Sequence, residues 1–179
     1  MEINSFFDKN PYSLNKNSKT SLLNDYFYEL TLYHYNNCKN YKKVLDAIGY
    51  DATIKKHYSG IPFLPVRLFK MFDMISVPKN NIVKTMTSSG TSGQEVSKIF
   101  LDKKTAFNQS KVLAKIVSSY IGSKRTPMII IDSPSVLKNR NMFSARGAGI
   151  LGFSIFGSKK IYALNDKMEL NINDLKTFL

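Results

Sequence analysis

Two prolines three residues apart divide this sequence into a part with helical spacing and a part with mixed spacing. Pro62 and Pro65 each fix their own φ angle and push the preceding residue away from helical geometry. We therefore expect a stiff, extended backbone there, leading into a new region. The sequence predicts a helical N-terminal portion, residues 1–60, and a second region of different architecture, residues 61–179.

Apolar residues in the first region recur at three- and four-residue spacing, which is typical of helices with one apolar face. Residues 1–20 are rich in Asn, Lys and Ser without a sustained period, and an irregular arm is predicted for them. Helices are predicted over residues 21–37 and 41–48. Gly49 follows the second at the position of a left-handed cap.

The second region mixes short apolar runs with one longer helical pattern. A short helix is expected over residues 66–72, and strands are predicted at 82–87, 97–101, 128–131 and 160–164. The strand at 128–131 is apolar on both faces, as a buried central strand should be. This order of elements predicts an α/β fold with a layered sheet.

One long helix is predicted between Asp102, a suitable N-cap, and Gly122, a suitable terminator. Its expected apolar side consists of Ala106, Phe107, Ser110, Leu113, Ala114, Val117 and Tyr120. The final apolar pattern runs through residues 172–179 without a polar tail. We therefore expect the 179 residues to be the first part of a longer protein.

Composition and charge exclude several classes of protein. With 43% hydrophobic residues the chain can bury a core, and no apolar run approaches the ~20 residues of a membrane-spanning helix. The N-terminus lacks a basic segment followed by an apolar one, so the expected location is the cytoplasm. The net charge of +13 comes from 22 Lys and only 4 Arg. Because Arg is the usual residue for phosphate and base recognition, no nucleic-acid interface is predicted, although the basic surface can attract nucleotides.

The sequence predicts neither a metal site nor a reactive cysteine. Cys38 is the single cysteine, and it forms no ligand cluster with His34 or His57, which stand in different contexts. We interpret Cys38 as a passive thiol and predict no metal-ligating residue.

The loop that follows the first predicted strand is the most informative segment. It is built from hydroxyl-bearing and glycine residues: Thr87, Ser88, Ser89, Gly90, Thr91, Ser92 and Gly93. Glycines let backbone N–H groups turn toward an anion, and the hydroxyls add donors, so the loop could cradle a triphosphate. The alternative is a polar hairpin turn between two strands.

Two other glycine loops are excluded by their context. Gly93 is followed by Gln94 rather than by the Lys-Ser or Lys-Thr pair of a Walker-type loop. A literal G-x-G-x-x-G occurs at Gly147, Gly149 and Gly152, but no β run precedes it. Close packing of a helix or turn is the interpretation for those glycines.

The loop resembles the phosphate-binding loop of the adenylate-forming superfamily. Three flanking segments, residues 61–70, 144–147 and 152–157, narrow the likeness to the acyl-protein synthetase (LuxE-type) family, from about residue 6 to residue 179. The resemblance implies the first part of the layered α/β domain of an adenylate-forming enzyme. It also implies ATP and Mg²⁺ as cofactors, a long-chain fatty acid as substrate, and an acyl reductase as a possible partner.

In such enzymes the fatty carboxylate attacks the α-phosphorus of ATP, pyrophosphate leaves, and the acyl group then passes to a cysteine thiol. The resemblance makes Ser88, Ser89, Thr91 and Ser92 the expected hydroxyl donors to phosphate, with Gly90 and Gly93 making room. The family's later motifs and its acceptor cysteine are expected beyond this sequence. No catalytic residue is therefore assigned, and the piece alone is expected to be inactive.

The loop departs from its superfamily where a Pro-Lys pair is usual, because Glu95 and Val96 stand there. Lys98 is the nearest cation, with a solvated strand position as the alternative. Arg146 is a second candidate for phosphate, and a structural salt bridge is its alternative. Two further functions remain open: an adenylating ligase acting on coenzyme A, and a noncatalytic basic binding module whose loop is only a turn.

Overall fold

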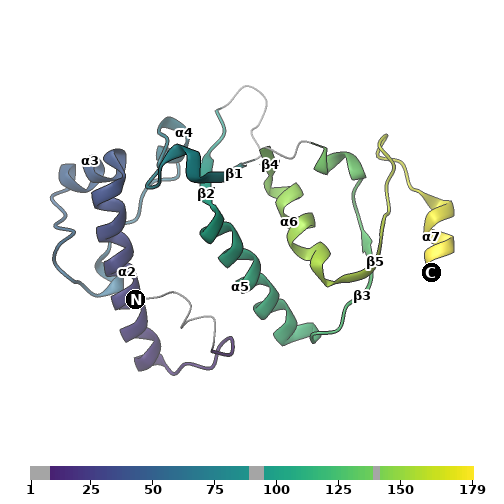
Figure 1. Ribbon diagram of the computed structural model, residues 1–179, viewed down its shortest axis with the longest axis horizontal. Coiled ribbons are helices and arrows are strands. Elements are labelled where there is room, and N and C mark those ends of the chain that lie inside the picture. Colours follow the sequence, from purple (N-terminus) through teal and green to yellow (C-terminus); the bar gives the residue numbers. More distant parts are fainter. Residues whose placement is uncertain (1–8, 89–94, 139–141) are drawn as a thin grey trace.

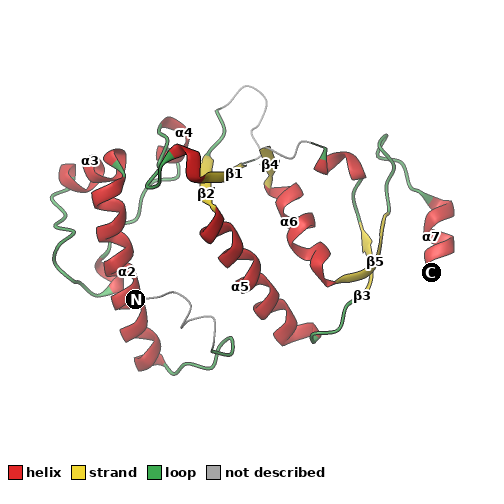
Figure 2. Cartoon of the chain, viewed as in Figure 1, coloured by secondary structure: helices red, strands yellow, loops and turns green. Residues whose placement is uncertain are grey.

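The computed structural model describes residues 9–88, 95–138 and 142–179, and it has the α/β composition that the sequence predicts (Figure 1, Figure 2). The helices are α2 (Lys16–Asn37), α3 (Lys39–Ala47), α4 (Leu68–Met71), α5 (Lys103–Ile121), α6 (Ala145–Phe153) and α7 (Ile172–Phe178). The strands are β1 (Ile82–Thr87), β2 (Lys98–Asp102), β3 (Thr126–Ile130), β4 (Met142–Ser144) and β5 (Gly157–Tyr162). Short 3₁₀ turns are η1 (Tyr58–Gly60), η2 (Lys79–Asn81), η3 (Pro134–Leu137) and η4 (Ser154–Phe156).

Helix α2 begins five residues before its predicted start, so the expected arm over residues 1–20 is wrong from Lys16 onward. Asn15 caps the helix: its side-chain oxygen accepts a hydrogen bond from the Ser18 N–H at 2.9 Å. That cap satisfies an N–H group that the first turn leaves without a partner. Helices α2 and α3 pack together, and Leu45 of α3 is completely buried. Gly49 ends the pair with the predicted left-handed backbone, at φ +66°.

In the described part of the chain, five strands form two small sheets. In the first, β1 lies between β2, which is antiparallel to it, and β4, which is parallel to it. The second consists of β3 and β5, which pair in parallel. Parallel pairing places the carboxyl ends of β1 and β4 at one edge of the sheet.

Helices α5 and α6 both contact β1, and both lie below the first sheet in the view of Figure 2. Helix α5 begins at its predicted cap: the Asp102 side chain accepts a hydrogen bond from the Thr105 N–H at 2.7 Å. The expectation that no β run precedes the glycines of α6 is wrong, because β4 ends directly before this helix. Close packing, the predicted role of the glycines, holds for Gly152, where a Cβ would lie 2.8 Å from Cδ2 of Leu113 on α5. It does not hold for Gly149, where a Cβ would meet no atom within 4 Å.

Two predictions about burial are wrong. Strand β3 forms, but in the described ranges it pairs with β5 alone and is not a central strand. It is also not buried on both faces: Ile129 is 36% exposed, and Ile131 just beyond the strand is 85% exposed. On α5, Phe107 and Tyr120 are 66% and 73% exposed, whereas Ala106, Leu113, Ala114 and Val117 of the same predicted apolar side are half-buried. Within the described residues, no helix is both long and apolar enough to cross a membrane.

Candidate functional site

The candidate phosphate loop leaves the sheet between β1 and β2. Its residues Ser89, Gly90, Thr91, Ser92 and Gly93 lie outside the described residues, so the structure shows only where the loop starts and ends. Ser88 closes the base of the loop against Ser97. The Ser88 N–H donates to the Ser97 carbonyl at 3.1 Å, and the Ser97 N–H donates to the Ser88 hydroxyl at 3.0 Å.

Ser97 carries a buried hydroxyl that has no hydrogen-bond partner among the described residues. The residue is 8% exposed and lies at the base of the loop. A buried hydroxyl without a partner carries a free-energy cost, because it has lost its water without gaining another donor or acceptor. Ser97 was not singled out from the sequence, because only the strand pairing shows that it stands opposite Ser88.

Strand register brings two predicted cations to the edge where the loop begins. Thr87, the last residue of β1, is opposite Lys98 of β2 on one side and Ser144 of β4 on the other. Arg146 follows Ser144 by two residues, in the first turn of α6. Since neighbouring strands lie ~4.8 Å apart, Lys98 and the start of α6 lie on either side of the loop base at about 10 Å. Lys98 lies on a strand, as expected, and it is exposed.

Two further cations lie beside the loop's other end. A hollow next to Glu95 is lined by Arg67 and Lys70, one helical turn apart at α4. Positions three residues apart share one face of a helix, so both side chains face the hollow together. Sequence reasoning missed them because α4 is distant in sequence from the loop. They place two positive charges beside the carboxylate of Glu95, which lines the same hollow.

Arg146 is engaged with Asp132, which immediately follows β3. Its Nε and Nη2 atoms donate to the two carboxylate oxygens at 2.5 Å each, a bidentate geometry. The pair joins the first sheet, through β4 and α6, to the second sheet, through β3. This is the salt-bridge alternative for Arg146. The Arg146 side chain is 56% exposed in this contact, so the ion pair does not bury it away from a ligand.

Asp132 was not predicted as a site residue, although it directly follows the predicted strand 128–131. Hydrogen bonding from Arg146 holds the pKa of Asp132 below its ordinary value, against the opposing effect of burial. The Ser133 N–H also donates to the Asp132 carboxylate at 2.7 Å. Burial and the nearby charge of Asp132 raise the pKa of Tyr162 on β5. The carboxylate is therefore ionised and fixed at the carboxyl ends of the parallel strands, an edge where α/β proteins commonly bind ligands.

Replacing Arg146 with Met is expected to lower Tm by roughly 3–6 °C at pH 7, because Asp132 loses its partner while remaining buried. A depressed carboxyl pKa stabilises the fold above the unfolded-state value near 4, and that stabilisation is lost as pH falls through the folded-state pKa. The difference in Tm between the wild type and Arg146→Met should therefore shrink below about pH 4. Thermal unfolding from pH 3 to 7 measures this.

Arg125→Met is the matched control, since Arg125 is exposed in the turn before β3. It should leave Tm unchanged across that range. Equal shifts for Arg125→Met and Arg146→Met at pH 7 would show that the Asp132 pair does not stabilise the fold.

The described residues contain no group of three or more His, Cys, Asp or Glu side chains that could hold a metal ion. Cys38 is buried where α2 meets α3, far along the chain from the loop. Neither finding adds a catalytic group to the loop region.

Comparison with known proteins supplies the family. The family model described as "Acyl-protein synthetase, LuxE" matches residues 2–178, which is nearly the whole sequence. A search of curated proteins finds no match. Since the model spans the helical portion, both sheets and the loop, the chain belongs to the LuxE acyl-protein synthetase family.

Proposed function

We propose that this chain carries the triphosphate-binding loop of an ATP-dependent acyl-protein synthetase that activates a long-chain fatty acid. The observation that carries the proposal is the base of the loop. There Ser88 and Ser97 hold the two ends together, and the buried Ser97 hydroxyl has no partner among the described residues. The Ser97 hydroxyl has already lost its water, so it can donate a hydrogen bond to a ligand without a further cost of desolvation. Such a donor at the base of a Ser/Gly loop fits an anionic ligand.

The charges around the loop support the same ligand. Lys98 and Arg146 stand at its first end, and Arg67 and Lys70 stand beside Glu95 at its second. In the proposed reaction, charge develops on the leaving pyrophosphate, which positioned N–H, hydroxyl and cationic groups stabilise. Mg²⁺, when bound, supplies further neutralisation of the phosphates. It would be held mainly by the phosphates themselves and by one or two carboxylates, the usual arrangement for this ion.

The proposed reaction has two steps, adenylation of the fatty acid and transfer of the acyl group to a thiol. A carboxylate oxygen of the fatty acid forms a bond to the α-phosphorus of ATP, and the bond to the β-phosphate oxygen breaks, releasing pyrophosphate. A thiolate then attacks the acyl carbonyl and AMP leaves. Cys38 is 3% exposed, so we do not assign it as the accepting thiol, and we propose that another cysteine of the synthetase accepts the acyl group. A reductase that takes up the acyl group is a further part of the proposal.

Isotope exchange between ATP and pyrophosphate tests the first step. In the complete synthetase polypeptide, exchange is expected only when fatty acid and Mg²⁺ are both present. Labelled acyl groups should then remain on the protein through denaturing electrophoresis and be released by neutral hydroxylamine, as a cysteine thioester would be. Transfer to added coenzyme A instead would identify a coenzyme A ligase. Salt-sensitive binding to nucleic acid without any exchange would identify a noncatalytic module and reject the proposal.

A further inference from the structure

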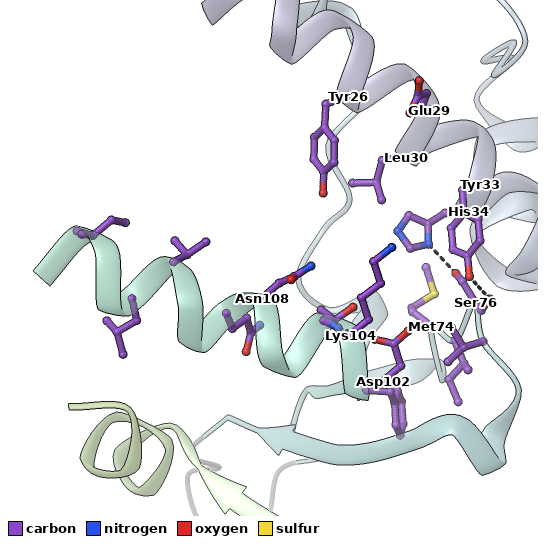
Figure 3. Close-up of a pocket in the computed structure, with 18 residues that line it drawn as sticks. Tyr26, Glu29, Leu30, Tyr33, His34, Met74, Ser76, Asp102, Lys104 and Asn108 are labelled. Atoms are coloured by element: carbon purple, nitrogen blue, oxygen red, sulfur yellow. Dashed lines mark hydrogen bonds between the residues drawn. The ribbon is translucent and has the colours of Figure 1, made fainter. Parts of the chain in front are cut away.

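A cavity of about 960 Å³ lies between α2 and α5 (Figure 3). Two carboxylates, those of Glu29 and Asp102, line it together with the ammonium group of Lys104. Because like charges repel, this excess of carboxylate disfavours a phosphate ligand in the cavity. The positive charge that a phosphate needs is instead at the base of the loop, where Arg146 lies.

The guanidinium of Arg146 has two edges that carry hydrogen-bond donors, and Asp132 occupies one of them. A guanidinium holds five N–H donors in one plane. Nε donates to Oδ2 of Asp132 and Nη2 donates to Oδ1, which uses two of the five. Within the described ranges Nη1 makes no hydrogen bond. The outer edge, formed by Nη1 and the second N–H of Nη2, therefore remains available, and such an edge fits two oxygens of one phosphate.

Asp132 is itself firmly held. The residue is 6% exposed, and its carboxylate accepts a hydrogen bond from the Ser133 N–H at 2.7 Å. Its backbone N–H donates to the Ile130 carbonyl at 2.8 Å, and its carbonyl accepts from the Leu164 N–H at 3.1 Å. The side chain of Arg146, in contrast, is long and 56% exposed. The fixed carboxylate therefore restrains a side chain that could otherwise change its rotamer freely in solvent.

The strand register places this restrained arginine beside the start of the loop. Ser144 of β4 pairs with Thr87, the last residue of β1, and Arg146 follows Ser144 by two residues. The loop begins directly after Thr87, with Ser88. A phosphate bound at the first end of the loop therefore lies near the arginine that Asp132 holds.

We propose that Asp132 is a positioning residue for the nucleotide: it holds Arg146 so that the outer edge of the guanidinium binds a phosphate of ATP. This inference rests on the proposed function, which supplies the nucleotide. Without Asp132 the arginine would become ordered only when ATP binds. Ordering such a flexible side chain on binding lowers affinity by up to about tenfold. With Asp132 the arginine is already ordered in the free protein, so the ligand gains the contact without that loss.

Pyrophosphate exchange in the complete synthetase polypeptide, with ATP and fatty acid varied in turn, tests the role of Asp132. Asp132→Asn should raise the KM for ATP about tenfold and leave the KM for fatty acid unchanged, because the amide has the same size but offers one acceptor oxygen instead of two. Arg146→Lys should raise the KM for ATP at least as much, since an ammonium group cannot bind both partners with a planar fork. The matched control is Asp166→Asn, which breaks the exposed ion pair with Lys138 and should change neither KM.

A double variant separates positioning from a purely structural role. In the Arg146→Met background, Asp132→Asn should cause no further rise in the KM for ATP, because Asp132 acts through the arginine. The same substitution should recover part of the Tm lost in Arg146→Met, since a neutral amide replaces a buried carboxylate without a partner. Affinity and Tm would then change independently, whereas a purely structural role would change them together.

Calorimetric titration with magnesium pyrophosphate, without fatty acid, distinguishes this inference from the proposed adenylation. Binding that Asp132→Asn weakens about tenfold, in a protein without any exchange activity, would reject adenylation and retain the phosphate site. The inference itself is overturned if the wild type does not bind pyrophosphate, or if Asp132→Asn binds it with wild-type affinity. Equal losses in Asp132→Asn and Asp166→Asn, or additive losses in the double variant, would also overturn it.

Discussion

Fatty-acid-dependent pyrophosphate exchange is expected to fall about a hundredfold or more when Gly90 is replaced by valine, the effect of losing positioned donors to a developing anion. Gly90 is the first glycine of the proposed phosphate loop. A branched Cβ there would keep backbone N–H groups from approaching phosphate oxygens. The measurement is exchange in the complete polypeptide at saturating ATP, with fatty-acid concentration varied.

Gly149→Val is the matched control for this substitution. Gly149 lies in α6, it is exposed, and a Cβ built on it meets no atom within 4 Å. Exchange should therefore stay at the wild-type level. If Gly90→Val also retained wild-type exchange, the loop would have no part in adenylation, and the alternative of a polar hairpin turn between two strands would be correct.

The largest loss of stability is expected from Leu45→Ala. Leu45 has no exposed surface, and its helix α3 packs against α2. Removing a buried leucine side chain costs about 2–5 kcal/mol, from lost transfer free energy and from the cavity that remains. Because few side chains in the described part of the chain are this deeply buried, little surrounding packing can compensate. Urea unfolding followed by far-UV circular dichroism measures the change.

Ile48→Ala is its control, three residues further along the chain and 56% exposed. That change should alter the free energy of unfolding by no more than about 0.5 kcal/mol. Equal losses for the two variants would mean that α3 is not packed on α2 as the structure has it.

Elements with strong local signals could be predicted from the sequence. Strand β1 has its predicted bounds, since β-prone residues end at a Ser/Gly run. Helix α5 starts and stops as predicted, because Asp102 accepts the Thr105 N–H and Gly122 adopts φ +81°. The start of α2 was missed although the same kind of signal was present: Asn15 caps it, but the polar residues around it hid the first turn.

Features that depend on tertiary neighbours could not be predicted. The apolar run of β3 suggested burial on both faces, yet burial depends on which elements pack over each face of a strand, and Ile129 of β3 is 36% exposed. The partner of Arg146 is Asp132, fourteen residues earlier, and the partner of Ser97 is Ser88 across a hairpin. The loop itself was found from its composition alone, and its phosphate role stays a prediction.

The buried thiol of Cys38, at the junction of α2 and α3, can report when these two helices separate. Cys38 ends one helix and begins the next: its N–H donates to the His34 carbonyl at 2.8 Å, and its carbonyl accepts from the Lys42 N–H at 2.9 Å. The thiol is 3% exposed and is the single cysteine of the sequence. An alkylating reagent therefore reacts in proportion to the fraction of molecules in which these helices have separated, when reclosing is faster than alkylation. Mass measurements over time give that fraction without an engineered residue.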